Sequence, residues 1–250
     1  MRRTSALILM GSLAAACAPP AGRESEEPSS PEALLAGAIE QASGARALEA
    51  ARALRWEGAA TVHAGDRDVA IRGEWAIQPP DSAVVATYDT TAGPATTRRL
   101  ILRSDTGWLE DAGVFQPMPP AVLAAERDEF YLYHVMRLVP LRMPGVELAP
   151  VPPDTLGQEG FEIRTPGRPP VSAYMDADGR LAHLRLRITD PRTGGQAWQD
   201  LWLTGAVEAG GVRWPREIRI TMDGEPYFDL ALDRLRVESR LVEPYLAGPP

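Results

Sequence analysis

From residue 54 onward, apolar and polar residues alternate along most of the chain with the period of two that half-buried β-strands show. The clearest case lies near the C-terminus, where Ile218 and Ile220 alternate with charged residues before an Asp-Gly pair at 223–224. Phe228 and Leu230 continue the alternation after that pair. An Asp-Gly pair tolerates the positive φ angles of a tight turn, so the segment 212–237 predicts a β-hairpin with one apolar and one solvated face.

The second strand of this hairpin changes phase. Leu235 and Val237 do not continue the alternation that includes Leu232, so one extra residue is expected near Asp233 or Arg234 as a β-bulge. A lone hairpin is only marginally stable in water. The hairpin is therefore expected to join a larger sheet and to organise it.

Further alternating runs, separated by turn residues such as Gly65-Asp66 and Asp178-Gly179, predict the rest of that sheet. The predicted strands cover 54–62, 69–77, 82–88, 98–104, 108–109, 161–165, 171–175, 181–188 and 197–207. With the hairpin they give about ten or eleven strands in one antiparallel sheet. The predicted fold class is mainly β, of the α+β type.

Two segments have helical rather than strand spacing. Ser30, Pro31 and Glu32 form a helix start, and the apolar stripe that follows predicts a helix to about Ala53. The segment 121–139 predicts one helix, or two short ones broken near Asp128. The prolines of 140–153 predict an extended crossing segment that serves as a lid or as a plain connector.

Composition limits the classes of protein. Apolar residues make up 44% and charged residues 24% of the chain, as in a soluble globular domain rather than a polytopic membrane protein. The net charge of -8 argues against nucleic-acid binding, which needs clustered cations. The sequence has neither a repeat nor a coiled coil, so a monomer is expected, and no cofactor motif is found.

Residues 1–16 predict a secretory signal peptide, with two arginines followed by an apolar run too short to span a bilayer. The run LAAAC at 13–17 resembles the lipobox of bacterial lipoproteins, which implies a diacylglycerol and a palmitate on Cys17. The alternative is an ordinary cleavage site with an incidental or buried thiol. In the lipoprotein interpretation, residues 17–30 are the lipidated cysteine and a disordered tether. Ala18 in place of aspartate favours the outer membrane, with the body facing the periplasm.

The order of elements resembles the lipoprotein localisation superfamily, which includes LolA and LolB. The likeness in sequence lies in GGVRWPREIRITM at 210–222 and DRLRVESRLVEPYL at 233–246, and in order of elements it covers about residues 31–245. The resemblance implies a curved sheet that forms an unclosed barrel, with helices on its open side and acyl chains on its concave face. Residues 31–245 are taken as this half-barrel domain and 246–250 as a tail.

We therefore expect a binding protein for the acyl chains of a lipid or of another lipoprotein, with no catalysis. The residues predicted to line its groove share the apolar face of their strands. They are Ile71, Trp75, Leu184, Leu186, Ile218, Ile220, Phe228 and Leu230. The alternative is an envelope scaffold or sensor with a self-filled core that binds protein partners.

No motif of catalysis or metal binding is present. His63, His134 and His183 lie far apart without a metal-site companion, and His183 is expected on a solvated strand face with Arg185 and Arg187. The sequence DADG at 176–179 predicts a hairpin turn rather than a calcium loop.

Two other groups of side chains leave their roles open. Glu126, Asp128 and Glu129 are expected to be solvated acids at the start of a helix. The tryptophans either fill the core, which we favour for any one of them, or line a groove. They are Trp75, Trp108, Trp198, Trp202 and Trp214.

Overall fold

The computed structural model describes residues 29–80, 82–190 and 192–241. The predicted signal peptide, Cys17 and the tether up to residue 28 lie outside the described residues, as does the predicted tail.

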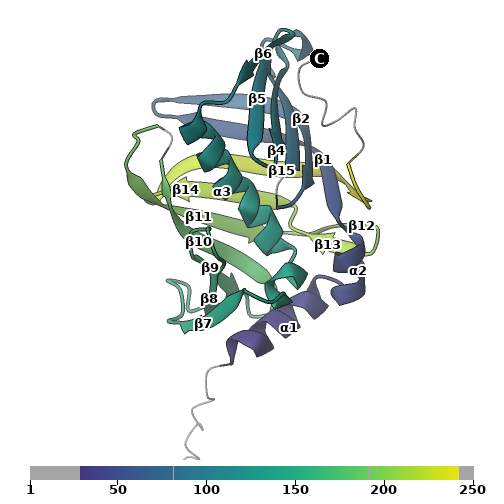
Figure 1. Ribbon diagram of the computed structural model, residues 1–250, viewed down its shortest axis with the longest axis vertical. Coiled ribbons are helices and arrows are strands. Elements are labelled where there is room, and N and C mark those ends of the chain that lie inside the picture. The colour runs from purple at the N-terminus through teal and green to yellow at the C-terminus, as the bar shows by residue number, and fades with distance from the viewer. Residues whose placement is uncertain (1–28, 81, 191, 242–250) are drawn as a thin grey trace, which may run out of the picture.

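The described residues form a large sheet with α1 and α2 at one end and α3 lying across it (Figure 1). The helical elements are α1 (Pro31–Gln41), α2 (Ala45–Ala50), η1 (Pro94–Thr96), α3 (Pro120–Met136) and η2 (Val139–Arg142). The strands are β1 (Ala53–Ala64), β2 (Arg67–Gln78), β3 (Ser82–Asp89), β4 (Arg98–Arg103), β5 (Thr106–Asp111), β6 (Val114–Pro117), β7 (Glu147–Val151), β8 (Gly160–Arg164), β9 (Val171–Met175), β10 (Leu181–Thr189), β11 (Gln196–Thr204), β12 (Val207–Ala209), β13 (Val212–Trp214), β14 (Glu217–Met222) and β15 (Glu225–Glu238).

Thirteen strands form one curved sheet in the order β6-β5-β4-β3-β2-β1-β15-β14-β11-β10-β9-β8-β7, and its strand pairs are antiparallel. β15 pairs with β1 on one side and with β14 on the other, so it joins the N-terminal arm of the sheet to the C-terminal arm. The sheet does not close into a barrel. The predicted class, a single unclosed antiparallel sheet with few helices, is confirmed.

The hairpin of β14 and β15 has the predicted turn and bulge. Asp223 and Gly224 both have positive φ, 49° and 86°, as a two-residue turn of this kind requires. Glu57 pairs with Arg234 and Gly58 with Leu232, which leaves Asp233 as the extra residue. The bulge increases the local twist where β15 passes between the two arms.

The first helix is shorter than its apolar spacing predicts. Ser30 caps α1, and its Oγ accepts a 3.2 Å hydrogen bond from the backbone N–H of Ala33. The helix ends at Gln41 because Ser43 and Gly44 take positive φ angles of 93° and 86°, and α2 begins only after them. The expected single helix to Ala53 is therefore wrong.

The sheet has thirteen strands, two more than the eleven at the upper end of the prediction. β6 is a short strand at one edge, and β7 is the opposite edge. β7 contains Pro150, so the proline-rich segment is partly an edge strand rather than a free crossing. Proline is tolerated there because an edge strand does not need every backbone donor.

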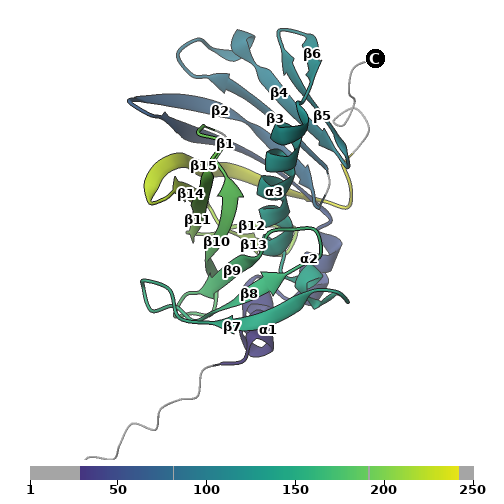
Figure 2. The ribbon, with the colours of Figure 1, turned by 60° about the vertical axis from the view of Figure 1, so that its left-hand side comes forward.

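α3 is one continuous helix that crosses the hollow of the sheet. It contacts β4 on one arm and β10 on the other, and the turned view of Figure 2 places it between the two arms. α1 and α2 lie at the end of the molecule that carries the edge strands β7 and β8, and α1 contacts both strands (Figure 1). The main core lies between the inner face of the sheet and these helices.

Candidate functional site

Strand register brings the predicted lining residues together on the inner face of the sheet. Ile71 pairs with Ala60, which pairs with Leu230, which pairs with Ile218, so one row crosses β2, β1, β15 and β14. The next row begins with Phe228 opposite Ile220 and continues through Leu201 to Leu184. Leu186 lies two residues further along β10 on the same face.

Exposure divides these residues into two groups. Trp75, Leu184, Leu186, Ile218, Ile220 and Leu230 are each at most 5% exposed. Ile71 and Phe228 are half-buried and pack at the margin of the core. The middle of the hollow is thus filled by side chains, and its apolar surface is accessible mainly where these two side chains lie.

α3 supplies the side chains that fill the middle of the hollow. Tyr133 packs against Trp56 with ring centroids 5.4 Å apart, and Phe130 packs against Tyr133 at 5.8 Å. Trp56 pairs in register with Trp75, so α3 rests on a pair of tryptophans from β1 and β2. The burial of these large rings accounts for much of the attachment of α3 to the sheet.

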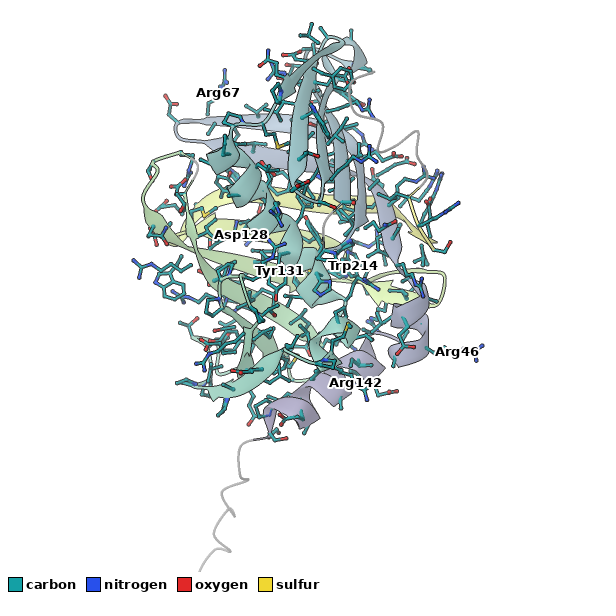
Figure 3. The ribbon with its side chains drawn as sticks, in the orientation of Figure 1. Arg46, Arg67, Asp128, Tyr131, Arg142 and Trp214 are labelled. Carbon is teal, nitrogen blue, oxygen red and sulfur yellow. The ribbon has the colours of Figure 1, made fainter. Side chains whose placement is uncertain are left out.

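Polar contacts hold α3 to the segment after β8. The Tyr131 hydroxyl donates a 2.7 Å hydrogen bond to Thr165 Oγ1. The Arg168 guanidinium lies 5.2 Å from the centre of the Tyr131 ring and 3.3 Å from Asp128 Oδ1. Figure 3 labels Asp128 and Tyr131 on the middle of α3. By contrast, Ala121, Val122 and Ala124 near the start of α3 are exposed, so that end is held less firmly.

Two carboxyl groups in the middle of α3, those of Glu126 and Glu129, are partly buried. Burial, and then the neighbouring Glu129, raise the pKa of Glu126 to about 8. Burial also raises the pKa of Glu129. These acids are one helical turn apart, so they share one face of α3. The expectation that they are solvated acids at a helix start is wrong.

Two phenols lie close to the same carboxyl groups. Burial raises the pKa of Tyr133, and the charges of Glu129 and Glu126 raise it further. The same causes, in the same order, raise the pKa of Tyr227 on β15 to about 12. The hollow therefore has an acidic and phenolic part beside its apolar rows. Sequence reasoning singled out these acids but expected them in solvent, because they stand three residues apart in an otherwise ordinary helix.

The three histidines are not members of the apolar rows. His63 forms hydrogen bonds with Asp68 and Asp229, and these bonds raise its pKa, the one to Asp229 most. His134 stacks on Tyr131 with ring centroids 5.8 Å apart. His183 lies on the outer face as expected, but it is only 2% exposed, so the prediction of a solvated position is wrong.

The tryptophans are divided between core and surface. Trp75 and Trp214 are buried, at 5% and 2% exposure. Trp108 packs at the edge of a small second cluster of apolar residues. Trp198 is 41% exposed and Trp202 half-buried on β11, facing away from the hollow.

No chemistry of metals or of membrane-spanning helices is found in the described parts of the chain. Within residues 29–80, 82–190 and 192–241, no group of three His, Cys, Asp or Glu side chains is placed to hold a metal ion. Among the same residues, no helix has the length and apolar character needed to span a membrane. The DADG segment forms the predicted turn, in which Asp176 Oδ1 accepts hydrogen bonds from the backbone N–H groups of Asp178 and Arg180.

Comparison with solved structures identifies the fold. A LolA superfamily protein from Nitrosomonas europaea superposes with a TM-score of 0.53 at 10% identity, covering 84% of this chain and 98% of its own. A DUF1329 family protein from Desulfovibrio piger gives 0.55 at 10% identity, with 87% and 97% covered. An outer membrane lipoprotein-sorting protein domain from Vibrio parahaemolyticus gives 0.50 at 12% identity, with 77% and 88% covered.

These similarities define the chain as a protein with the unclosed half-barrel fold of LolA-like and lipoprotein-sorting proteins, as the sequence resemblance predicted. No family model matches the sequence, and no curated protein matches it. At 10 to 12% identity the likeness concerns the fold. Residue roles must therefore be argued from this chain alone.

Proposed function

We propose that this protein is a lipid-anchored protein of the bacterial envelope that binds acyl chains of a lipid or of another lipoprotein in the hollow under α3, without covalent chemistry. The anchor would be Cys17, which holds the body at the outer membrane, facing the periplasm. Two or more acyl chains suffice for stable anchoring, whereas one chain gives only marginal binding.

The observation that carries the proposal is the single helix over a continuous apolar surface. The inner rows of β2, β1, β15, β14, β11 and β10 present apolar side chains to the hollow, and among the described residues α3 is the only helix that contacts strands of both arms. An apolar ligand that replaced α3 side chains would keep the sheet face covered. Pockets for such ligands are mainly apolar with a few polar groups, and Glu126, Glu129 and Tyr227 supply those groups.

The ligand would enter at the less firmly held end of α3. Ile71 and Phe228 on the sheet are half-buried, and Leu123 is the partly buried residue near the start of α3 that packs against the core. Movement of residues 120–126 would expose both rows without breaking the Tyr131–Thr165 bond. α3 then acts as a lid attached by its C-terminal half.

The burial of six lining residues favours a second candidate function. In it, the core stays filled and the protein is an envelope scaffold or sensor that binds protein partners. The two functions differ in one property, which is displacement of α3 by an acyl chain.

A fluorescent fatty acid distinguishes the two functions. It should bind the anchor-free protein and be displaced by an unlabelled fatty acid. Ile71→Asp places a charge in the hollow and should weaken binding at least about tenfold, since a buried charge is costly. Ala70→Asp is the matched control, because Ala70 is the preceding residue of β2 and is exposed on the opposite face. Equal effects of the two substitutions, or no binding by the parent protein, would contradict the proposal.

A further inference from the structure

The outer face of the sheet carries a second groove, separate from the hollow and with a volume of about 720 Å³. It lies over β9, β10, β11 and β14 and is bordered by the loop after β7. Its lining combines aromatic rings, aspartates and an arginine. The lining residues on β9, β10 and β11 are Tyr174, His183, Arg185, Trp198, Asp200 and Trp202.

A stack of three rings forms the floor of the groove. His183 lies between Tyr174 and Trp202, with ring centroids 5.1 Å and 3.8 Å away. Its Nε2 is 2.8 Å from Asp200 Oδ1 and its Nδ1 is 3.1 Å from Asp154 Oδ2. Asp154 belongs to the loop after β7, so this network holds the loop against the sheet. The floor is therefore rigid before any ligand binds.

Trp198 forms an exposed wall beside this floor. The Arg185 guanidinium lies 4.7 Å from the centre of its ring, and that of Arg187 lies 5.9 Å away. The Trp198 backbone N–H donates a 2.9 Å hydrogen bond to Asp223 Oδ1. The indole is thus held from both its ring and its backbone, yet it remains 41% exposed. An aromatic ring held in place on the surface is a ready platform for stacking.

The charges in the groove are already paired. Asp200 contacts His183 and lies 3.7 Å from the Nε of Arg185. Asp154 contacts His183 and accepts backbone N–H groups of Leu156 and Gln158. A cation would thus find no unpaired carboxylate in the floor, and an anion would face Asp154, Asp200 and Asp223. A purely apolar ligand would displace water from these polar groups without replacing its hydrogen bonds, which costs free energy.

Hydroxyl groups fit such paired charges best, because each hydroxyl both donates and accepts hydrogen bonds. A carboxylate keeps lone pairs, and a guanidinium keeps N–H groups, after each has made one ion pair. Sugar rings combine many hydroxyls with an apolar face that stacks on an aromatic ring. We propose that this groove binds a neutral glycan chain, with one sugar ring on Trp198 and hydroxyls on Arg185, Asp200 and Asp223.

The proposal is independent of lipid binding in the hollow. Its test is saturation-transfer NMR on chitotetraose and maltotetraose with the full chain, kept in a polyoxyethylene detergent whose head group is not a sugar. Sugar protons should receive saturation from the protein in at least one of the two. The Trp198→Ala variant should weaken that binding about tenfold, because it removes the stacking platform.

Two further variants separate a binding role from a structural one. Trp198→Phe keeps an aromatic face and should retain binding within about fivefold of the parent protein. Leu109→Ala is the control, because Leu109 on β5 has the same 41% exposure and lies far from the groove in strand order. The proposal is overturned if neither saccharide binds, if a proline-rich decapeptide binds in their place, or if Trp198→Ala binds as tightly as Leu109→Ala.

Discussion

The Tyr131 hydroxyl donates a 2.7 Å hydrogen bond to Thr165 Oγ1, which ties the middle of α3 to the chain directly after β8. Arg168 contacts the same tyrosine ring and Asp128 on the preceding turn of the helix. These polar contacts of α3 are therefore made to the C-terminal arm of the sheet, whereas its aromatic contacts are made to β1 on the other arm. Neither set of contacts involves the exposed start of α3, which is why we expect that end to open.

Tyr131→Phe removes the bond to Thr165 while keeping the ring. The free energy of unfolding should fall by about 1 kcal/mol, the usual net value of one hydrogen bond. Amide hydrogen exchange in residues 120–136 should also be faster in the variant than in the parent protein, while exchange in the sheet stays the same. The measurement is urea unfolding combined with exchange mass spectrometry. Tyr88→Phe is the control, since Tyr88 is a half-buried tyrosine on β3, outside the contacts between α3 and the segment after β8. Unchanged exchange in α3 would contradict the assigned role of this bond.

The carboxyl groups under α3 should make stability depend on pH. Burial raises the pKa of Glu126 from 4.5 to about 8, so between these values the folded chain keeps a proton that the unfolded chain has lost. Stability should thus fall as pH rises from about 4.5 to about 8 and then level off. Glu126→Gln removes the part of this fall that is due to Glu126, while Glu129 keeps its own contribution. The substitution should stabilise the protein at pH 8 by on the order of 1 to 2 kcal/mol, less than the full pKa shift implies because the side chain is partly exposed.

The control for this pH effect is Glu225→Gln, which changes an exposed acid at the start of β15. Its unfolding free energy should follow the parent protein across the whole range. If Glu126→Gln shows the same pH profile as the parent protein, then Glu126 is not buried in the way described.

Gly58 allows the close approach of β1 and β15 at the bulge. A Cβ atom at this position would lie 2.4 Å from the backbone oxygen of Ala231, so Gly58→Ala requires the strands to separate. We expect a loss of about 1 to 3 kcal/mol in unfolding free energy, as for other overpacked sites. Gly37→Ala, on an open face of α1, should instead stabilise the protein by up to about 1 kcal/mol. Thermal unfolding of both variants measures the difference, and a neutral Gly58→Ala would refute the close packing.

Cys17 is the predicted lipid anchor, and its replacement tests that prediction directly. Cells grown with an alkyne analogue of palmitate should label the parent protein, and the label should be absent from Cys17→Ser. The variant should also move from the membrane to the soluble periplasmic fraction. Replacement of Ser29 by Ala, in the tether beyond the cysteine, is the control. Membrane association that survives Cys17→Ser would exclude this anchor.

Much of the sheet could be predicted because its signals are local. The alternation on β14 and β15, the Asp-Gly turn and the phase change at Asp233 each depend on a few neighbouring residues. The edge strands β6 and β7 were missed because β6 has only four residues and β7 contains a proline. The break after α1 depends on Ser43 as well as Gly44, and a serine is not an expected site of positive φ.

The sites were harder to predict than the strands, because they depend on tertiary contacts. His183 on β10 is covered by Asp154, which lies 29 residues earlier on the loop after β7. Glu126 and Glu129 look like ordinary surface acids until the curvature of the sheet encloses them. The apolar rows followed from strand periodicity, but their burial depended on how closely α3 packs, which no short segment encodes.

Native mass spectrometry of residues 18–250, exported to a bacterial periplasm and purified without detergent, tests the central proposal most directly. Our account predicts a complex with about one molecule of phospholipid or fatty acid per chain, because an acyl chain would occupy the hollow under α3. The Ile71→Asp variant should lose that ligand and Ala70→Asp should keep it. A ligand-free mass that stays unchanged after incubation with lipid would contradict the proposal and favour a self-filled core.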